Sequence, residues 1–334
     1  MTDGPAMSDR DPDVGCDELV RVGADWERAI EAIHTAPGAV LVLGSPDCGK
    51  TTWVGEAARC LSRAGVLPLA ILDADIGQSV IGPPASVALA LLREPAGEGF
   101  SLRALPTEGL IFVGAVSPVG HLLQLLVATA RLAERAKRVG ARTVLVDTTG
   151  LVTPGIGFQL KLRKIELLEP SHLVALQRGG ELEALLSVVC GRPGLRLHRL
   201  AVTPKARVRT PAERAAYRES RFADYFKGAG RLSLPTERLR ILRAPSGGGR
   251  LVGAPDVDVF TGAELRDSGI APGLLLGLNT AADETVGLGL LEEIGADGRE
   301  LRVRTPVTDA SAVRLVQLGS ARLQPSGEER RSSG

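Results

Sequence analysis

The segment from Gly44 to Thr51 constrains the fold more than any other part of the sequence. It reads Gly-Ser-Pro-Asp-Cys-Gly-Lys-Thr and fits the pattern Gly-x-x-x-x-Gly-Lys-Ser/Thr at every fixed position. The apolar run Ala39–Leu43 precedes it, and Lys50–Arg63 follows with helix-compatible spacing. A strand, a glycine-rich loop and a helix in this order form the phosphate-binding loop (P-loop) of nucleoside-triphosphate enzymes. We therefore expect an α/β fold that holds a triphosphate at this loop.

The residue types of this loop suit the binding of phosphate and Mg²⁺. Glycines let backbone N–H groups turn inward around the β-phosphate, and the N-terminus of the helix adds partial positive charge. Lys50 is expected to reach the β- and γ-phosphates, and the Thr51 hydroxyl is expected to ligate Mg²⁺. The residues expected to bind the nucleotide are Gly44, Ser45, Pro46, Asp47, Cys48, Gly49, Lys50, Thr51 and Thr52.

Strand-like and helix-like segments alternate from Ala39 to about Leu200. The expected strands are Ala39–Leu43, Leu67–Leu72, Leu110–Val113, Thr143–Val146 and His172–Leu176. The expected helices are Lys50–Arg63, Val119–Arg138, Phe158–Leu168 and Glu181–Val189. This alternation predicts a mostly parallel sheet that is covered by helices on both faces.

The composition and the residue pattern change after about Gly230, where glycine and proline become frequent. The short alternating segments there are Leu239–Arg243, Leu274–Leu278, Val286–Glu292, Leu301–Thr305 and Val313–Leu318. They predict an antiparallel β-rich domain with tight turns such as Gly295–Gly298. We expect a disordered tail over residues 1–24, a P-loop domain over 25–230, a smaller C-terminal β-rich domain over 236–324, and a second disordered tail over 325–334.

Composition places the chain among ordinary globular proteins. It has 334 residues, of which 44% are hydrophobic and 24% are charged. The longest apolar runs, Leu122–Thr129 and Gly273–Leu278, are too short to cross a membrane. The four cysteines lack metal-ligand or disulfide spacing, and the four histidines are dispersed. We therefore expect reduced thiols, a cytoplasmic location, no membrane partner and no structural zinc site.

Positive charge is concentrated in one stretch, although the net charge of the chain is only +1. From Arg192 to Arg221 nine basic residues face two acidic ones. Such a stretch is either a solvated helix face or a site for an anionic partner. If Pro211–Phe226 is a helix, Arg214, Arg218 and Arg221 fall on one face of it. Guanidinium groups on such a face could neutralise charge that develops during phosphoryl transfer.

A second motif resembles the Walker B arrangement. Thr143–Val146 is an apolar strand that ends in Asp147, a carboxylate placed to hold Mg²⁺ through its water shell. The same segment, Asp147-Thr148-Thr149-Gly150, also fits the Asp-x-x-Gly pattern of GTPases, so it does not separate a GTPase from an ATPase or a kinase. An aspartate at the end of a strand can also serve as a helix cap or a turn former.

Two carboxylates mark the expected acceptor side. Asp73 and Asp75 follow the second strand, at the edge where open α/β sheets bind ligands. A hydroxyl acceptor needs a carboxylate that orients it and takes its proton. A turn with solvated aspartates is the alternative interpretation.

The series Asp73-x-Asp75-x-Gly77-Gln78, with Pro83-Pro84 after it, resembles the polynucleotide 5′-hydroxyl kinases. This family includes the kinase subunit of the eukaryotic pre-mRNA cleavage machinery and the kinase of pre-rRNA processing. The resemblance covers roughly residues 39–226 and, more loosely, the β-rich domain through Thr305-Pro306. Further matches in the expected order are Phe112-Val113-Gly114, Ser117-Pro118, Asp147-Thr148-Thr149-Gly150, Leu160-Lys161, Lys164-Ile165, Arg209, Arg214, Arg218 and Tyr225-Phe226.

The resemblance implies a role for each matched position. Lys50 and Thr51 would hold the triphosphate and Mg²⁺, the latter together with Asp147, and Asp75 would activate the 5′-hydroxyl, with Asp73 as the competing candidate. The resemblance also implies an Arg-rich helical lid around residues 205–228, in which Arg209, Arg214 and Arg218 lie over the transferring phosphoryl group. The residues implied near the substrate are Asp73, Gln78, Thr149 and Gly150. The implied function is a P-loop kinase that uses ATP and Mg²⁺ to phosphorylate 5′-hydroxyl ends of RNA or DNA; GTP and other nucleoside triphosphates remain open as donors.

Other functions stay open at the level of sequence. The main rival is a regulatory or scaffold GTPase or ATPase that has only water as its acceptor. The Asn-Lys-x-Asp loop of most GTPases is missing, because the only asparagine is Asn279 and no lysine follows it. A small-metabolite kinase remains possible, and an ATPase of cofactor or metal assembly lacks its characteristic lysine-bearing loop here. Leu151 stands where the large eukaryotic kinases have a base-clamping tryptophan, and His121 is either a substrate contact or a helix-capping residue.

Overall fold

The computed structural model describes residues 24–203, 206–243 and 259–324. The two expected tails therefore lie outside the described residues, except for Ala24, which begins the first helix. None of the helices within the described ranges is long and apolar enough to cross a membrane.

The first sheet, sheet A, has the strand order β4-β3-β2-β5-β1-β6-β7. Its parallel strands are β1 (Ala39–Gly44), β2 (Leu69–Ala74), β5 (Thr143–Thr148), β6 (His172–Gln177) and β7 (Arg196–Ala201). Two strands, β3 (Ser86–Leu92) and β4 (Gly109–Phe112), pair antiparallel at the β2 side. The prediction of a mostly parallel sheet is confirmed.

Two strands of sheet A were not predicted. The seven residues of β3 are all buried and form a short apolar run, whose periodicity does not distinguish a strand from a buried helix. Edge strand β7 buries only Leu200, so its sequence lacks the apolar run by which the other strands were found.

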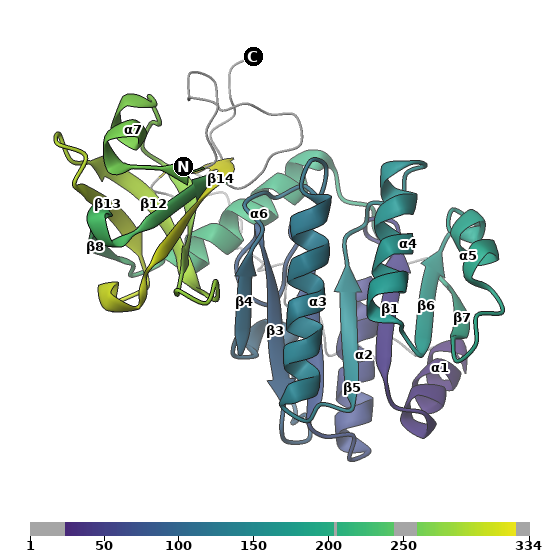
Figure 1. Ribbon diagram of the computed structural model, residues 1–334. Helices are drawn as coiled ribbons and strands as arrows, with labels where there is room; N and C mark the ends of the chain where they lie inside the picture. The colour runs from purple at the N-terminus through teal and green to yellow at the C-terminus, as the bar shows by residue number, and fades with distance from the viewer. Residues whose placement is uncertain (1–23, 204–205, 244–258, 325–334) are drawn as a thin grey trace, which may run out of the picture.

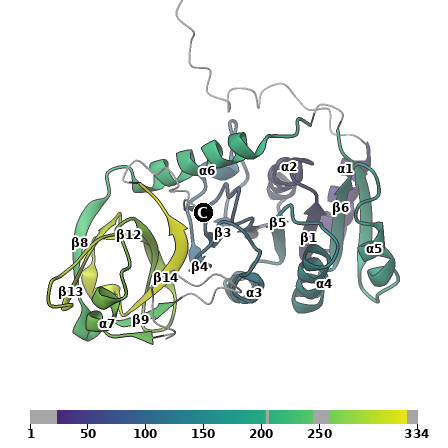
Figure 2. The ribbon, with the colours of Figure 1, turned by 90° about the horizontal axis from the view of Figure 1, so that it is seen from above.

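Helices cover both faces of sheet A (Figures 1 and 2). On one face lie α1 (Ala24–Thr35) and α2 (Lys50–Arg63), and on the other lie α3 (Leu122–Arg138), α4 (Ile156–Leu168) and α5 (Glu183–Val189). Successive residues of β1 point to opposite faces, so Val40 and Val42 join the α1–α2 core while Leu41 and Leu43 join the α3–α5 core.

The second sheet, sheet B, curls around its own apolar core (Figure 2). Its order is β10-β9-β14-β11-β12-β13-β8, and every pair is antiparallel except β9 with β14. The strands are β8 (Gly230–Pro235), β9 (Arg240–Arg243), β10 (Val259–Phe260), β11 (Leu274–Asn279), β12 (Thr285–Ile294), β13 (Glu300–Thr305) and β14 (Leu315–Arg322). Helix α7 (Gly262–Asp267) and the short 3₁₀ turns η2 (Thr236–Arg238) and η3 (Ala310–Ala312) complete this half, while η1 (Leu102–Ala104) belongs to the first. The predicted β-rich C-terminal half is confirmed.

Helix α6 (Pro211–Phe226) crosses from the loop edge of sheet A to sheet B (Figure 2). Its end contributes Phe222 and Phe226 to an apolar cluster shared with Phe112 of β4 and Leu288 of β12. Hydrogen bonds fix the same junction. The Phe112 N–H donates to Thr285 Oγ1 at 2.9 Å, and the Leu288 N–H donates to the Tyr225 hydroxyl at 2.8 Å. The two halves are therefore joined by a packed and hydrogen-bonded interface.

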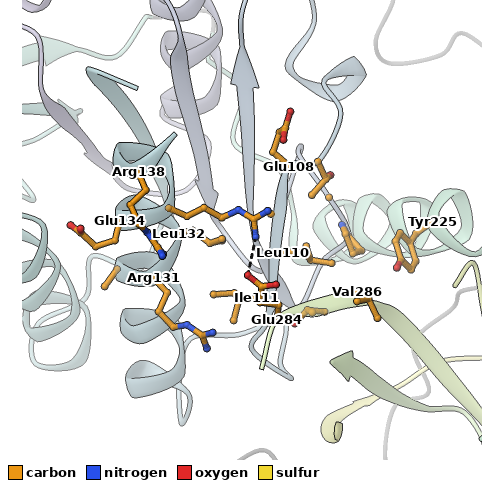
Figure 3. A pocket seen from close by; sticks show the side chains of 17 residues that line it. Glu108, Leu110, Ile111, Arg131, Leu132, Glu134, Arg138, Tyr225, Glu284 and Val286 are labelled. Atoms are coloured by element: carbon orange, nitrogen blue, oxygen red, sulfur yellow. Dashed lines mark hydrogen bonds and ion pairs between the residues drawn. The ribbon is translucent and has the colours of Figure 1, made fainter. Parts of the chain in front are cut away.

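A cavity of about 660 Å³ lies at this junction, between β4, the second half of α3 and the start of β12 (Figure 3). Two of the arginines that line it pair across the junction. Arg135 lies 3.4 Å from Glu284, and Arg131 lies 2.9 Å from Asp283. Gly109, Leu110 and Ile111 of β4 line the cavity, and so do Gly82 and Pro83 from the segment between β2 and β3.

Gly277 of β11 packs directly against Phe112 at the junction. A Cβ atom there would lie 2.4 Å from Cδ1 of Phe112 and 2.8 Å from its Cβ. We expect Gly277→Ala to lower the free energy of unfolding by roughly 1–3 kcal/mol, as overpacking does. Gly97→Ala is the matched control, because a Cβ there meets no atom within 4 Å. Urea unfolding measures both variants, and equal stabilities would refute the tight contact.

Candidate active site

The P-loop connects β1 to α2 with a backbone that its glycines permit. Gly49 has a φ of 92°, in the left-handed region, and a Cβ on Gly44 would lie 2.3 Å from Cys48 Sγ. Helix α2 begins at Lys50 with no side-chain cap and no acidic residue in its first turn. Its first N–H groups and its positive helix end therefore remain available to a phosphate.

Side chains brace this loop from two directions. The buried Lys50 ammonium donates to the Ser45 carbonyl at 2.9 Å. Arg178, directly after β6, donates to the carbonyls of Pro46 at 3.3 Å and Asp47 at 2.6 Å. Glu181 accepts from the Ser45 hydroxyl at 2.9 Å. Our sequence analysis missed Arg178 and Glu181, although their place just after a strand on the ligand edge is a signal that could have been used.

Thr51 and Asp147 form the part of the site that fits Mg²⁺. The Thr51 hydroxyl donates to Asp147 Oδ2 at 2.5 Å, while Asp147 Oδ1 is buried and has no hydrogen-bond partner in the described part of the chain. Burial raises the pKa of Asp147, and the Lys50 charge and the Thr51 hydrogen bond oppose that rise. A buried carboxylate oxygen without a partner beside a hydroxyl suits a hard cation that keeps several waters.

No group of three or more His, Cys, Asp or Glu side chains that could hold a metal ion occurs among the described residues. A Mg²⁺ site of this kind takes one or two protein ligands and completes its coordination with waters and substrate phosphates. The pair of Thr51 and Asp147 is sufficient for such a site.

Asp73 and Asp75 have different surroundings. Asp73 is the second-to-last residue of β2 and lies opposite Asp147 of β5, and its carboxylate accepts from the backbone N–H groups of Asp75, Val80 and Ile81 at 2.6–3.0 Å. Burial and the neighbouring Asp147 charge raise the pKa of Asp73 to about 8. Both of its oxygens are engaged with the loop that follows β2, so its geometry favours shaping that loop.

Asp75 lies one residue beyond β2 and is only half-buried. Its Oδ1 accepts from the N–H groups of Gly77 at 3.2 Å and Gln78 at 3.1 Å. Its Oδ2 receives no hydrogen bond from any residue that the structure describes. Of the two aspartates, Asp75 is therefore the one with an oxygen open to an acceptor hydroxyl.

Helix α4 brings two buried lysines beneath these carboxylates, and our sequence analysis assigned no role to either. Lys161 donates to Thr148 Oγ1 at 2.8 Å and to the Thr149 carbonyl. The Lys164 ammonium is fully buried and, within the described residues, has no hydrogen-bond partner. Burial lowers its pKa to about 8, and the nearby charges of Asp75, Asp147 and Asp73 oppose that shift. Lys164 thus offsets part of the negative charge that collects at the ends of β2 and β5.

The loop after β5 completes the wall of the site. A Cβ on Gly150 would lie 2.7 Å from the backbone nitrogen of Pro46, so this loop packs directly against the P-loop. Thr149 is buried beside it. The structure thus places Gly150 against the phosphate loop, with Thr149, the other expected substrate-side residue, next to it in the chain.

Helix α6 is the expected lid, and it begins and ends where the sequence predicted. Thr210 and Glu213 form a capping box at its start. Just before it, Arg209 contacts Asp47 of the P-loop, with Nε 2.8 Å from Oδ1, and Arg214 Nη1 lies 3.2 Å from Oδ2. Burial raises the pKa of Asp47, but the hydrogen bonds and charges of Arg209 and Arg214 outweigh it and hold the pKa below its usual range.

The lid is also hydrogen-bonded to the loop that carries Asp75, residues 75–85 between β2 and β3, which we call the acceptor loop. Gln78 Nε2 donates to the Arg214 carbonyl at 3.0 Å, and the Tyr217 hydroxyl donates to the Ser79 carbonyl at 3.2 Å. Arg221 donates to the carbonyls of Val80 and Gly82, both at 2.9 Å. The lid therefore contacts the P-loop at its start and the acceptor loop along its length.

We expect Arg214→Ala and Arg218→Ala each to lower kcat by roughly 10²-fold or more while weakening nucleotide binding much less. The reason is that a guanidinium group over the transferring phosphoryl group acts mainly in the transition state. Arg207→Ala is the control on the same segment, since Arg207 is exposed and pairs with Glu213. Steady-state kinetics and nucleotide titration measure the three variants. Normal turnover in both lid variants would show that the basic stretch is only a solvated helix face.

Similarity to known proteins agrees with this arrangement. The family described as mRNA cleavage and polyadenylation factor CLP1 P-loop matches residues 44–228, which include the phosphate loop, the Asp73–Gln78 segment and the lid. A polyribonucleotide 5′-hydroxyl-kinase of Pyrococcus abyssi is 28% identical over 90% of this chain and 92% of its own length. One from Methanocaldococcus jannaschii is 28% identical over 88% of this chain and 89% of its own length.

The fold recurs in a solved structure. A chain in the wild-type Clp1p–Pcf11p complex superposes with a TM-score of 0.65 at 13% identity, and the match covers 88% of this chain and 77% of that one. The resemblance inferred from the motifs is confirmed by the family match, which extends over more than half of the sequence. The chain therefore belongs to the family of the mRNA cleavage and polyadenylation factor CLP1 P-loop.

Proposed function

We propose that this protein is a polynucleotide 5′-hydroxyl kinase that transfers the γ-phosphoryl group of ATP, or of another nucleoside triphosphate, to the 5′-hydroxyl end of RNA or DNA. The observation that carries the proposal is the open Oδ2 of Asp75, which lies on the same sheet edge as the Thr51–Asp147 pair. An enzyme that only hydrolyses the nucleotide needs the Thr51–Asp147 pair to bind Mg²⁺, but it has no need of a carboxylate on the acceptor side. The similarity to archaeal polyribonucleotide 5′-hydroxyl-kinases supports the same function.

The residues divide the reaction among them. Asp75 Oδ2 accepts a hydrogen bond from the 5′-hydroxyl and holds its oxygen in line with the γ-phosphorus. The hydroxyl oxygen forms a bond to that phosphorus, the bond from phosphorus to the β–γ bridging oxygen breaks, and the nucleoside diphosphate leaves. The hydroxyl proton passes to Asp75.

Negative charge that develops on the transferring phosphoryl group is stabilised by cationic side chains. Lys50 lies at the P-loop, and Arg209, Arg214 and Arg218 supply guanidinium groups from the lid. When bound beside Thr51 and Asp147, Mg²⁺ would neutralise charge on the β- and γ-phosphates. The contacts from Gln78 and Tyr217 to the lid and the acceptor loop keep these groups in register.

The test is a transfer assay with γ-labelled ATP and four acceptor conditions: 5′-hydroxyl RNA, 5′-hydroxyl DNA, nucleosides and no acceptor. We expect label on the oligonucleotide ends and only slow release of phosphate without an acceptor. Label on nucleosides alone would indicate a small-metabolite kinase. Rapid hydrolysis of ATP or GTP with no labelled acceptor would instead support a scaffold or regulatory nucleotide hydrolase.

A further inference from the structure

A cavity of about 220 Å³ lies between the loop that follows β4 and the end of β14. Ser117 and His121 line it from the P-loop half, and Ser320 and Arg322 line it from sheet B. It shares no lining residue with the larger junction cavity.

The two walls of this cavity are held together by backbone contacts. The Ser320 N–H donates to the Gly114 carbonyl at 2.7 Å, and its hydroxyl donates to the same oxygen at 3.1 Å. A Cβ on Gly319 would lie 2.9 Å from that carbonyl, so the strands approach as closely as glycine allows. The contacts that join the two sheets therefore also fix the walls of this cavity.

Its polar groups have unused donor capacity. His121 is only 5% exposed, yet its Nδ1 has no hydrogen-bond partner in the part of the chain that the structure describes. The half-buried Arg322 makes no ion pair and no side-chain hydrogen bond with any described residue. Ser117 Oγ accepts from the Val119 N–H at 3.3 Å, which leaves its proton for another acceptor. A guanidinium, an imidazole and a hydroxyl together suit a phosphate oxygen.

The cavity adjoins the acceptor side of the active site. Gly77 follows Asp75 in the acceptor loop, and a Cβ on Gly77 would lie 2.7 Å from the Val116 carbonyl and 3.7 Å from Asp75 Oδ1. Val116 belongs to the cavity wall. One glycine thus separates the carboxylate that would hold the 5′-hydroxyl from the cavity.

We propose that this cavity binds a phosphodiester of the acceptor strand, 3′ to the nucleoside that is phosphorylated. The inference rests on the proposed kinase function and adds the contact that distinguishes a polynucleotide from a nucleoside. A 5′-hydroxyl end carries no phosphate of its own, so the nearest negative charge is a linkage on its 3′ side. Arg322 and His121 recognise that charge and orient the strand.

The experiment combines protein variants with acceptors in which a single linkage is made neutral, and it measures KM for each combination. Short 5′-hydroxyl oligonucleotides carry one neutral methylphosphonate linkage at the first, second or third position. In wild type, one of these positions is expected to raise KM by about 10-fold, the loss of a charge-assisted hydrogen bond. In Arg322→Ala, KM for the unmodified strand rises by a similar factor, and the neutral linkage has no further effect.

His121→Ala is the second variant, and thermal unfolding checks that each variant is folded. Arg138→Ala removes an equal charge from the end of α3, at the other junction cavity, and keeps the wild-type response to every linkage. If the neutral linkage has the same effect in Arg322→Ala, His121→Ala and wild type, the subsite is refuted while the kinase function stands. If wild type phosphorylates no 5′-hydroxyl end at all, the proposed function itself fails and the subsite fails with it.

Discussion

Lys50→Ala is expected to abolish phosphoryl transfer, with a loss of roughly 10³-fold or more in kcat/KM, and to leave the protein folded. The ammonium group is the one cation that α2 places inside the P-loop, where it donates to the Ser45 carbonyl at 2.9 Å and to Cys48 Sγ at 3.9 Å. Removing it leaves the β- and γ-phosphates without their nearest protein charge. The fold loses about one hydrogen bond, which contributes roughly 1 kcal/mol.

The measurement pairs the γ-label assay with thermal unfolding of the same preparation. Lys137→Ala is a suitable control, because Lys137 is exposed at the end of α3 and pairs with Glu134. We expect normal transfer from it. A folded Lys50→Ala protein that still transfers phosphate at the wild-type rate would remove the P-loop from the proposed mechanism.

The second large effect is expected at Asp75. Asp75→Asn should lower transfer to 5′-hydroxyl oligonucleotides by roughly 10²–10⁴-fold, the range that general base catalysis supplies. Affinity for Mg·ATP should stay near wild type, because Thr51 and Asp147 serve the metal whichever nucleophile attacks. Slow hydrolysis, in which water replaces the acceptor, should suffer much less.

The parallel variant Asp73→Asn tests the competing base. Asp73 accepts three backbone hydrogen bonds within the loop 75–81, so its replacement is expected to lower stability by about 1–3 kcal/mol as well as activity. Chromatographic separation of labelled products, nucleotide titration and urea unfolding measure both variants. Normal transfer by Asp75→Asn together with failure of a stably folded Asp73→Asn would reassign the base. Loss of nucleotide binding in both variants would place the segment in the metal site.

Local patterns in the sequence were sufficient for the parts of the site that lie within one motif. The strand, loop and helix around Lys50 depend on glycine freedom and on a short apolar run, which neighbouring residues alone decide. From the sequence, a helix over Pro211–Phe226 was considered because its arginines would share one face, and the structure has a helix with these bounds. The proline and the capping box at its start are further local signals of the same helix. The carboxylate at the end of Thr143–Val146 was visible for the same reason.

Only the tertiary structure decided which of these groups are free to act. Asp73 and Asp75 are both carboxylates at the end of the second strand in the sequence. In the structure the N–H groups of Val80 and Ile81 engage Oδ2 of Asp73 and that of Asp75 engages its Oδ1, whereas Oδ2 of Asp75 stays open. Lys164 would be expected at a solvated helix surface, yet the packing of α4 over the strand ends buries it completely. The junction with sheet B likewise depends on close approaches at Gly277 and Gly319 between segments that are far apart in the chain. Such long-range contacts decide which side chains are buried and which hydrogen-bond partners they have, and a short segment of sequence does not contain these contacts.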